Sequence, residues 1–144
     1  MKINLKSFIL TRRELQIMKV VWDRESATVQ DVHDVLTRIK PMSRNTILTM
    51  IRILEQKGAL THRRCGRAYI YEPILSRSQA TQNQIRDLVA RFFDGKAVKL
   101  LETVIQNEIN EPEQLEIAKS FVNSKLMPVY AGDIKSPQLS IRAS

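Results

Sequence analysis

Four polar side chains follow one another at helical spacing near the middle of the chain, at Asn45, Thr49, Arg52 and Gln56. At about 100° per residue, these positions fall on one face of a helix. Side-chain amides and guanidiniums can contact base edges in the major groove of DNA, as can the hydroxyl and the methyl group of threonine. The pattern therefore predicts a short helical surface that recognises a base sequence.

The opposite face of the same segment is apolar and indicates how such a helix is held. Its residues have the spacing i, i+3, i+4, i+7 of an amphipathic helix and are Ile47, Met50, Ile51 and Leu54. Ser43 is a good N-cap, because its hydroxyl can accept a hydrogen bond from a free amide of the first turn. Gly58 is a good stop, because glycine adopts the left-handed conformation that ends a helix.

A basic hairpin is predicted directly after Gly58. The runs Leu60–Arg64 and Ala68–Glu72 have the composition of strands, and Cys65–Arg67 is a tight turn between them. Within Lys40–Arg67, seven basic residues accompany a single acid. This concentration of charge favours a polyanionic partner over a protein that is merely basic and soluble.

We expect the DNA contacts to come from the start and outer face of this helix and from the hairpin. The candidate DNA-binding residues are Ser43, Arg44, Asn45, Thr46, Leu48, Thr49, Arg52, Arg63, Arg64 and Arg67. A helix followed by a basic hairpin is the recognition half of a winged helix-turn-helix, in which the hairpin lies against the DNA backbone.

Two further helices precede this unit, each opened by a capping box. Thr11 with Glu14 begins the first helix, which we expect to end near residues 24–26, and Thr28 with Asp31 begins the second. The predicted core residues of the first are Leu15, Met18, Val21 and Trp22, and those of the second are Val29, Val32, Val35, Leu36 and Ile39. Pro41 then breaks the second helix, because proline disfavours a helical residue before it.

The C-terminal half has a different composition. From Ser76 onward, 9 basic residues are balanced by 8 acidic ones, whereas residues 1–75 hold 14 and 7. Three short amphipathic segments are too small to bury their apolar faces alone. Either they pack onto the winged helix or they interlock with a second chain, and we favour a homodimer because two half-sites require one. The candidate dimerisation residues are Leu88, Phe92, Phe93, Leu101, Val104, Ile105, Leu115, Phe121 and Val122.

The sequence thus predicts a mainly α fold with a small β-hairpin wing. Its parts are a winged helix-turn-helix domain over residues 1–75, a helical dimerisation domain over 76–126 and a disordered tail over 127–144. The start of the chain lacks the apolar run of a signal peptide, and no stretch approaches the roughly 18 apolar residues of a membrane helix. We therefore expect a cytoplasmic protein.

Few residues of the sequence could form a catalytic, metal or redox site. Glycine-rich phosphate loops, zinc-binding His-Glu motifs and nucleophile elbows are absent from the sequence, so we expect no enzyme and no cofactor. His62 and Cys65 are only two potential metal ligands. The arginines around Cys65 would favour its thiolate and permit redox chemistry, although a small turn residue is the simpler interpretation. A winged helix that contacts protein or RNA remains the alternative to DNA binding.

Several segments resemble a known family in their order and spacing. They are LTRRELQIMKVVWD, VQDVHDVL, SRNTILTMIRILEQKGAL, CGRAYIYEP and FFDGKAVKLLETVIQNE. From Leu10 to Val122 the chain resembles the penicillinase-repressor family of bacterial winged-helix regulators (BlaI/MecI type). The resemblance implies a homodimer that binds an operator with dyad symmetry. Thr46 and Thr49 match base-facing threonines of the family, Gly66 and Arg67 match its wing turn, and Ile53 stands where a basic residue is usual.

The resemblance also implies a possible route of induction. In members induced by proteolysis, a membrane-bound sensor leads to cleavage of an Asn-Phe bond in the dimerisation region. The matching positions here are Thr103 and Val104, and the sequence contains no Asn-Phe pair. We therefore expect either a different scissile bond near Leu101–Ile105 or no proteolytic control.

Overall fold

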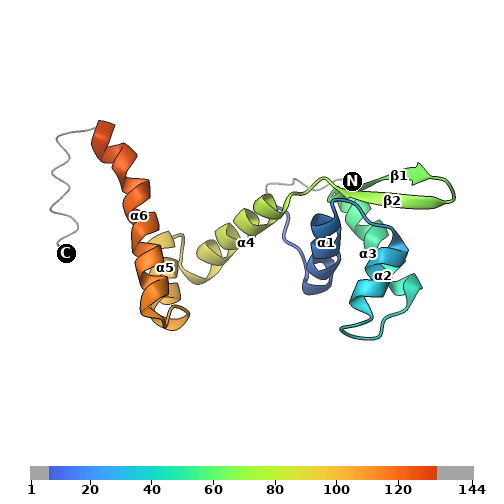
Figure 1. Ribbon diagram of the computed structural model, residues 1–144, viewed down its shortest axis with the longest axis horizontal. Helices are drawn as coiled ribbons and strands as arrows, with labels where there is room; N and C mark the ends of the chain where they lie inside the picture. Colours follow the sequence, from blue (N-terminus) through green and yellow to red (C-terminus); the bar gives the residue numbers. More distant parts are fainter. Residues whose placement is uncertain (1–6, 133–144) are drawn as a thin grey trace. The chain divides into compact units, whose positions relative to one another are not determined.

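The structure is a computed structural model that describes residues 7–132. Its elements in chain order are α1 (Arg12–Arg24), α2 (Val29–Leu36), α3 (Arg44–Lys57), β1 (Leu60–Cys65), β2 (Ala68–Pro73), α4 (Arg77–Phe92), α5 (Ala97–Asn107) and α6 (Pro112–Gly132) (Figure 1). The chain divides into two compact units, Met1–Phe92 and Phe93–Ser144. The predicted mainly α fold with a β-hairpin wing is confirmed.

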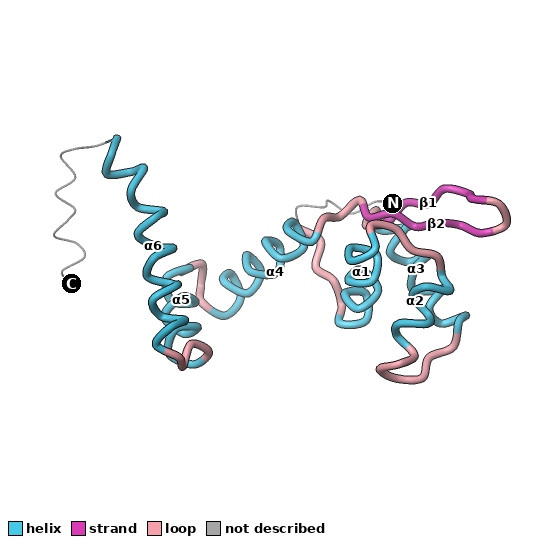
Figure 2. The backbone as a smooth tube through the Cα atoms, in the orientation of Figure 1, coloured by secondary structure: helices cyan, strands magenta, loops and turns pink. Residues whose placement is uncertain are grey.

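The first unit begins as a winged helix-turn-helix, with three helices followed by an antiparallel two-stranded ribbon (Figure 2). Local hydrogen bonds start each helix where the sequence predicts. The Thr11 hydroxyl accepts from the Glu14 N–H at 3.2 Å, and the Glu14 carboxylate accepts from the Thr11 N–H at 2.9 Å. The Ser43 hydroxyl accepts from the Thr46 N–H at 3.1 Å, and Gly58 ends α3 with φ of 91°.

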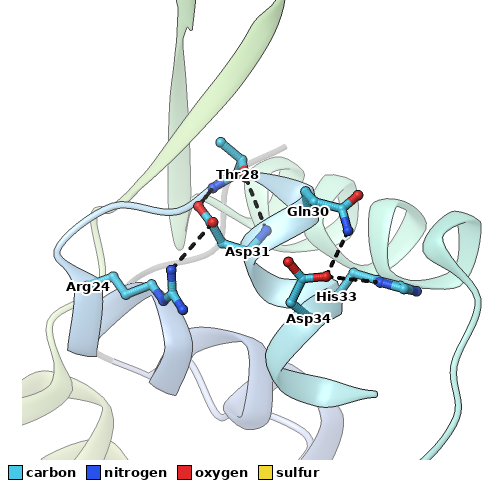
Figure 3. A network of polar contacts seen from close by, with 6 residues as sticks. All are labelled: Arg24, Thr28, Gln30, Asp31, His33 and Asp34. Atoms are coloured by element: carbon cyan, nitrogen blue, oxygen red, sulfur yellow. Dashed lines mark hydrogen bonds and ion pairs between the residues drawn. The ribbon is translucent and has the colours of Figure 1, made fainter. Parts of the chain in front are cut away.

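The capping box of α2 belongs to a small polar network (Figure 3). Thr28 and Asp31 exchange their hydrogen bonds at 2.9 and 3.1 Å, and Arg24 at the end of α1 lies 3.4 Å from the Asp31 carboxylate. The hydrogen bond from the Thr28 backbone is the main cause of a lowered Asp31 pKa, with further lowering by the Thr28 hydroxyl and Arg24 and partial opposition from burial. The ion pair adds a polar contact between the end of α1 and the start of α2.

The core lies between α1, α2, α3 and the base of the hairpin. Its fully buried side chains include Ile17 and Met18 from α1, Ile51 and Leu54 from α3, and Leu60 from β1. The predicted apolar stripe of α3 is confirmed, with Met50 only partly buried at its edge.

On α1 the prediction was partly wrong, because Leu15 and Trp22 are only half-buried and Ile17 is fully buried in their place. Neighbours on more than one side cause this shift, since α1 packs against α2, α3 and β2. Trp22 nevertheless packs against the core, and its indole N–H donates to the Leu75 carbonyl at 2.8 Å.

The predicted second helix is too long. α2 ends at Leu36, and Ile39 in the following turn is 69% exposed instead of buried. After Leu36 the chain continues in a tighter turn, in which the Arg38 N–H donates to the Val35 carbonyl at 3.3 Å and the Ile39 N–H to the Leu36 carbonyl at 3.0 Å. The helix therefore ends before the chain reaches Pro41.

The hairpin turn is shorter than predicted. Cys65 pairs with Ala68 as part of the ladder, so only Gly66 and Arg67 form the turn. Gly66 has φ of 63°, which suits the first position of the two-residue turns that match strand twist. At the base of the hairpin, Tyr71 exchanges backbone hydrogen bonds of 3.0 and 2.9 Å with Ala27, which fastens the hairpin to the loop before α2.

The first half of α4 is attached to the winged helix. Asn83 is 2% exposed, and its amide donates to the Phe8 carbonyl at 3.0 Å while its oxygen accepts from Gln79 at 2.7 Å. Arg77 pairs with Asp23 of α1. The compact unit therefore continues through α4, whereas the functional boundary between residues 75 and 76 stays a prediction.

The second unit contains α5 and α6. α6 runs to Gly132, so residues 127–132 are helical although the sequence predicted a disordered tail there. The rest of that predicted tail, residues 133–144, lies outside the described residues. Within residues 7–132, every helix is too short or too polar to cross a lipid bilayer.

Candidate nucleic-acid interface

The outer face of α3 carries the polar side chains that the sequence singled out. Asn45, Thr49, Arg52 and Gln56, here called the reading face, are all exposed. They lie opposite the buried residues of the same helix, as the periodicity requires. The Thr49 hydroxyl donates to the Asn45 carbonyl at 2.9 Å, so it remains an acceptor for other groups.

The N-terminal end of α3 is suited to an anion. Arg44 and Thr46 are exposed there, and the Ser43 hydroxyl lies 2.8 Å from the Thr46 hydroxyl. The first turn of α3 contains no acidic residue. Its positive dipole end is therefore not neutralised by a carboxylate from the helix itself, which favours phosphate binding.

A groove of about 410 Å³, here called the wing groove, runs between α3 and the hairpin. It brings Arg44 and Arg52 of α3 together with Arg67 of the hairpin turn. Leu48, a predicted DNA contact, lines this groove but is half-buried and packs against the core. Three guanidiniums beside the reading face form a surface that attracts a phosphate backbone.

The sequence missed part of this groove. Thr28 and Gln30 at the start of α2 and Tyr69 of β2 also line it. The signal for α2 was present, because in a helix-turn-helix the second helix braces the recognition helix. The alternation of Tyr69, Ile70 and Tyr71 predicts that the two tyrosines share a face of the strand, but that this face lines the groove depends on the packing of the hairpin against α3.

The single acid of the basic segment is paired within the fold. The Glu55 carboxylate lies in hydrogen-bond contact with Nδ1 of His62 on β1, and the His62 ring meets Tyr69 edge-on with centroids 4.8 Å apart. Tyr71 lies buried beside them, and burial, followed by the charge of Glu55, raises its pKa above the usual range. These contacts join the hairpin to α3, and they occupy the Glu55 carboxylate within the fold.

The arginines of the hairpin differ in the polar partners that the fold provides for their guanidinium groups. Arg63 pairs with Glu72 on the neighbouring strand, and the hydrogen bond to this carboxylate raises the pKa of Arg63 above its usual value. The Arg64 Nε donates to the Gly66 carbonyl at 3.2 Å, and Arg67 is exposed at the turn. We therefore expect Arg64 and Arg67 to approach a phosphate more readily than Arg63.

Cys65 has an exposed free thiol in the last pair of the strand ladder. Its predicted redox role stays a prediction. Within the described part of the chain, no group of three or more histidine, cysteine, aspartate or glutamate side chains is placed to hold a metal ion.

The predicted dimerisation residues are distributed over α4, the following loop, α5 and α6. The exposed ones include Phe92, Leu101, Leu115, Phe121 and Val122, and Phe121 reaches 72% exposure. The half-buried ones are Leu88, Phe93, Val104 and Ile105. A groove of about 370 Å³ within the second unit brings Leu101 and Ile105 of α5 beside Leu115 and Val122 of α6.

The sequence matches known proteins over most of its length. The model of the family described as penicillinase repressor matches residues 10–122. The penicillinase repressor of Bacillus licheniformis is 32% identical over 108 residues, which cover 71% of this chain and 84% of that relative. The methicillin resistance regulatory protein MecI of Staphylococcus aureus is 18% identical over 120 residues, covering 83% and 98%.

A solved structure is also similar. It is the solution structure of monomeric Bacillus licheniformis BlaI in complex with the blaP half-operator, which is 34% identical with a TM-score of 0.45. The match covers 55% of this chain and 93% of that one.

Proposed function

The chain belongs to the penicillinase repressor family, and from this membership we propose that it works as a homodimer on a dyad-symmetric operator. It is a DNA-binding transcriptional repressor and not an enzyme. The dimer represses by occupancy, because a protein bound across a promoter excludes polymerase.

One observation carries the proposed mode of DNA binding. The exposed reading face of α3 lies beside the wing groove, where Arg44, Arg52 and Arg67 meet. A helix that contacts base edges needs neighbouring cations that hold the phosphate backbone and so fix its register. Both parts occur in one compact unit, with the helix start open to an anion.

The proposed dimer rests on the second unit. Its helices expose Leu101, Leu115, Ile117, Phe121 and Val122, a set of large apolar side chains that is unusual on the surface of a monomer. Isologous pairing with a second copy would remove this surface from water. Two winged helices joined in this way match two half-sites.

Selection of binding sites from a random pool of duplex DNA tests the proposed function. We expect the enriched sequences to contain two inverted half-sites at a fixed spacing, with affinity that falls steeply as salt rises. Enrichment of a single undivided site, or of no sequence at all, would contradict the proposal.

Release from DNA is proposed not to use the bond that the family resemblance implies. The corresponding residues Thr103 and Val104 lie inside α5, and Val104 is half-buried. Cleavage near Leu101–Ile105 would break the apolar face of α5 and so weaken the dimer. Mass spectrometry of the repressor recovered from induced cells checks this: we expect intact protein or a fragment cut elsewhere in that segment, and a fragment that begins at Val104 would overturn the expectation.

A further inference from the structure

α3 has a second flank, on the side of the reading face away from the hairpin. At about 100° per residue, Thr46 and Ile53 lie on this flank, whereas Leu48 and Glu55 lie on the flank that faces the wing groove. A groove of about 510 Å³ separates Thr46, Met50 and Ile53 from Arg12 and Arg13, the first two residues of α1. The start of α1 thus borders the reading face.

Arg12 and Arg13 are exposed, and the described residues provide neither guanidinium with an ion-pair partner. Glu14, the only acid in the first turn of α1, points inward, where its carboxylate lies 2.9 Å from the Lys57 ammonium with only 7% of its side chain exposed. The two positive charges therefore face solvent beside α3.

Arg12 and Arg13 do not stabilise the helix at whose start they lie. Cations at a helix N-terminus are opposed by the macrodipole, and the capping box of Thr11 and Glu14 already satisfies the start of α1. Two adjacent arginines at this end are unfavourable for the helix, so a partner with negative charge is the simpler explanation for their presence.

We propose that Arg12 and Arg13 bind phosphates of the DNA strand on the side of α3 opposite the hairpin. The inference rests on the proposed function. A helix in the major groove lies between two phosphate backbones, and the wing groove provides cations for one of them. Arg12 and Arg13 provide the planar, always charged groups that suit the other. The winged helix grips DNA on both flanks of its reading face.

Salt titrations with a random-sequence duplex test the inference, because phosphate contacts do not depend on base sequence. We compare the wild-type protein with Arg12→Gln, Arg13→Gln and Lys19→Gln. Lys19 is the matched control, since it is an exposed cation of the same helix that lines a different groove, with α4. Each arginine variant is expected to lower the slope of log affinity against log salt by about 0.9 per subunit.

The control separates contact from overall charge. Lys19→Gln removes the same unit of charge and is expected to leave the slope within error of the wild type. A double Arg12→Lys, Arg13→Lys variant keeps the charge and is expected to retain most of the slope. The melting temperature of the glutamine variants is expected to equal or exceed that of the wild type, because the dipole penalty is relieved.

The two possible failures are distinguishable. If the wild-type protein shows no salt-dependent binding to duplex DNA, the proposed function itself is wrong. If the wild type binds and the arginine variants retain its slope, or if Lys19→Gln lowers the slope equally, the assignment of Arg12 and Arg13 to phosphate is wrong and the proposed function stands.

Discussion

At the residue scale, the reading face and the hairpin turn have different chemistry. Asn45 and Thr49 are short side chains one helical turn apart on a rigid element, and they are exposed near the open end of α3. Arg67 lies at a two-residue turn and carries a long flexible cation. Rigid amides suit base recognition, and flexible cations suit phosphates.

Substitution of Asn45 by alanine is expected to reduce affinity for the selected operator by roughly 1–3 kcal/mol and to change affinity for random duplex little. An amide pairs with two atoms of adenine, and this pairing is lost only where adenine is present. Fluorescence anisotropy on both duplexes measures the difference. Gln82→Ala removes an exposed amide from α4, outside the reading face, and is the matched control that is expected to change neither affinity. Equal weakening on both duplexes would show that Asn45 positions the helix and does not recognise a base.

Substitution of Arg67 by alanine is expected to weaken operator and random duplex to a similar degree. One phosphate contact per subunit is lost, so the salt slope should fall by about one unit per subunit. Titration at several salt concentrations gives the slope directly. A loss confined to the operator would instead place Arg67 among the base contacts.

At the element scale, the helix starts depend on short-range chemistry, which is why they could be predicted. Each capping box needs only a threonine and an acid three residues later, and the structure forms both boxes. The periodicity of a single helix likewise predicted that the reading face is exposed to solvent. The start of α2 was predicted correctly. Its end was not, because the tighter turn after Leu36 has no signal in the spacing of the apolar residues.

Features that join distant segments could not be predicted in this way. Asn83 is buried because Phe8, 75 residues away, supplies its partner. Arg12 and Arg13 meet the flank of α3 only because α1 crosses α3. A polar residue in a helical pattern gives no local sign of such a partner.

The capping box of α2 predicts a pH dependence of stability. The Asp31 pKa is lowered in the folded state, chiefly by the Thr28 backbone N–H, so the charged carboxylate stabilises the fold above the unfolded pKa. That contribution is lost as the pH falls through the folded pKa. Asp31→Asn is therefore expected to reduce the free energy of unfolding at neutral pH and to match the wild type in strong acid. Urea denaturation at both pH values measures the difference.

The neighbouring acid provides the control for this effect. Asp34 lies one turn further along α2 and accepts from the Gln30 amide at 2.8 Å, outside the capping box. Asp34→Asn is expected to change the stability less than Asp31→Asn at neutral pH. If the two variants behave alike at every pH, the capping box is not the source of the effect.

At the scale of the whole molecule, positive charge is unevenly distributed along the chain. Residues 1–75 carry the excess of basic side chains. Exposed large apolar side chains occur in both units, but they lie closer together in sequence in the shorter second unit. This distribution supports a division of labour in which the first unit contacts DNA and the second unit holds two copies together.

A fragment that ends at Phe92 is expected to be a folded monomer that binds DNA weakly. It keeps the complete first unit, including the contact of Asn83 with Phe8, and lacks α5 and α6. Sedimentation velocity compares its mass with that of the full chain. A fragment ending at Leu75 is a useful second sample and is expected to unfold more easily, because it lacks that contact. A tight dimer of the Phe92 fragment would move the interface into the first unit.

The stoichiometry of the full chain on a selected operator tests the proposed function most directly. Titration of a full-site duplex, followed by sedimentation equilibrium, is expected to show two chains per duplex. A duplex with only one half-site is expected to bind at least about 100-fold more weakly, because joining two binding units adds to affinity without new contacts. One chain per full site, or equal affinity for the full site and the half-site, would contradict a homodimeric repressor on a dyad-symmetric operator.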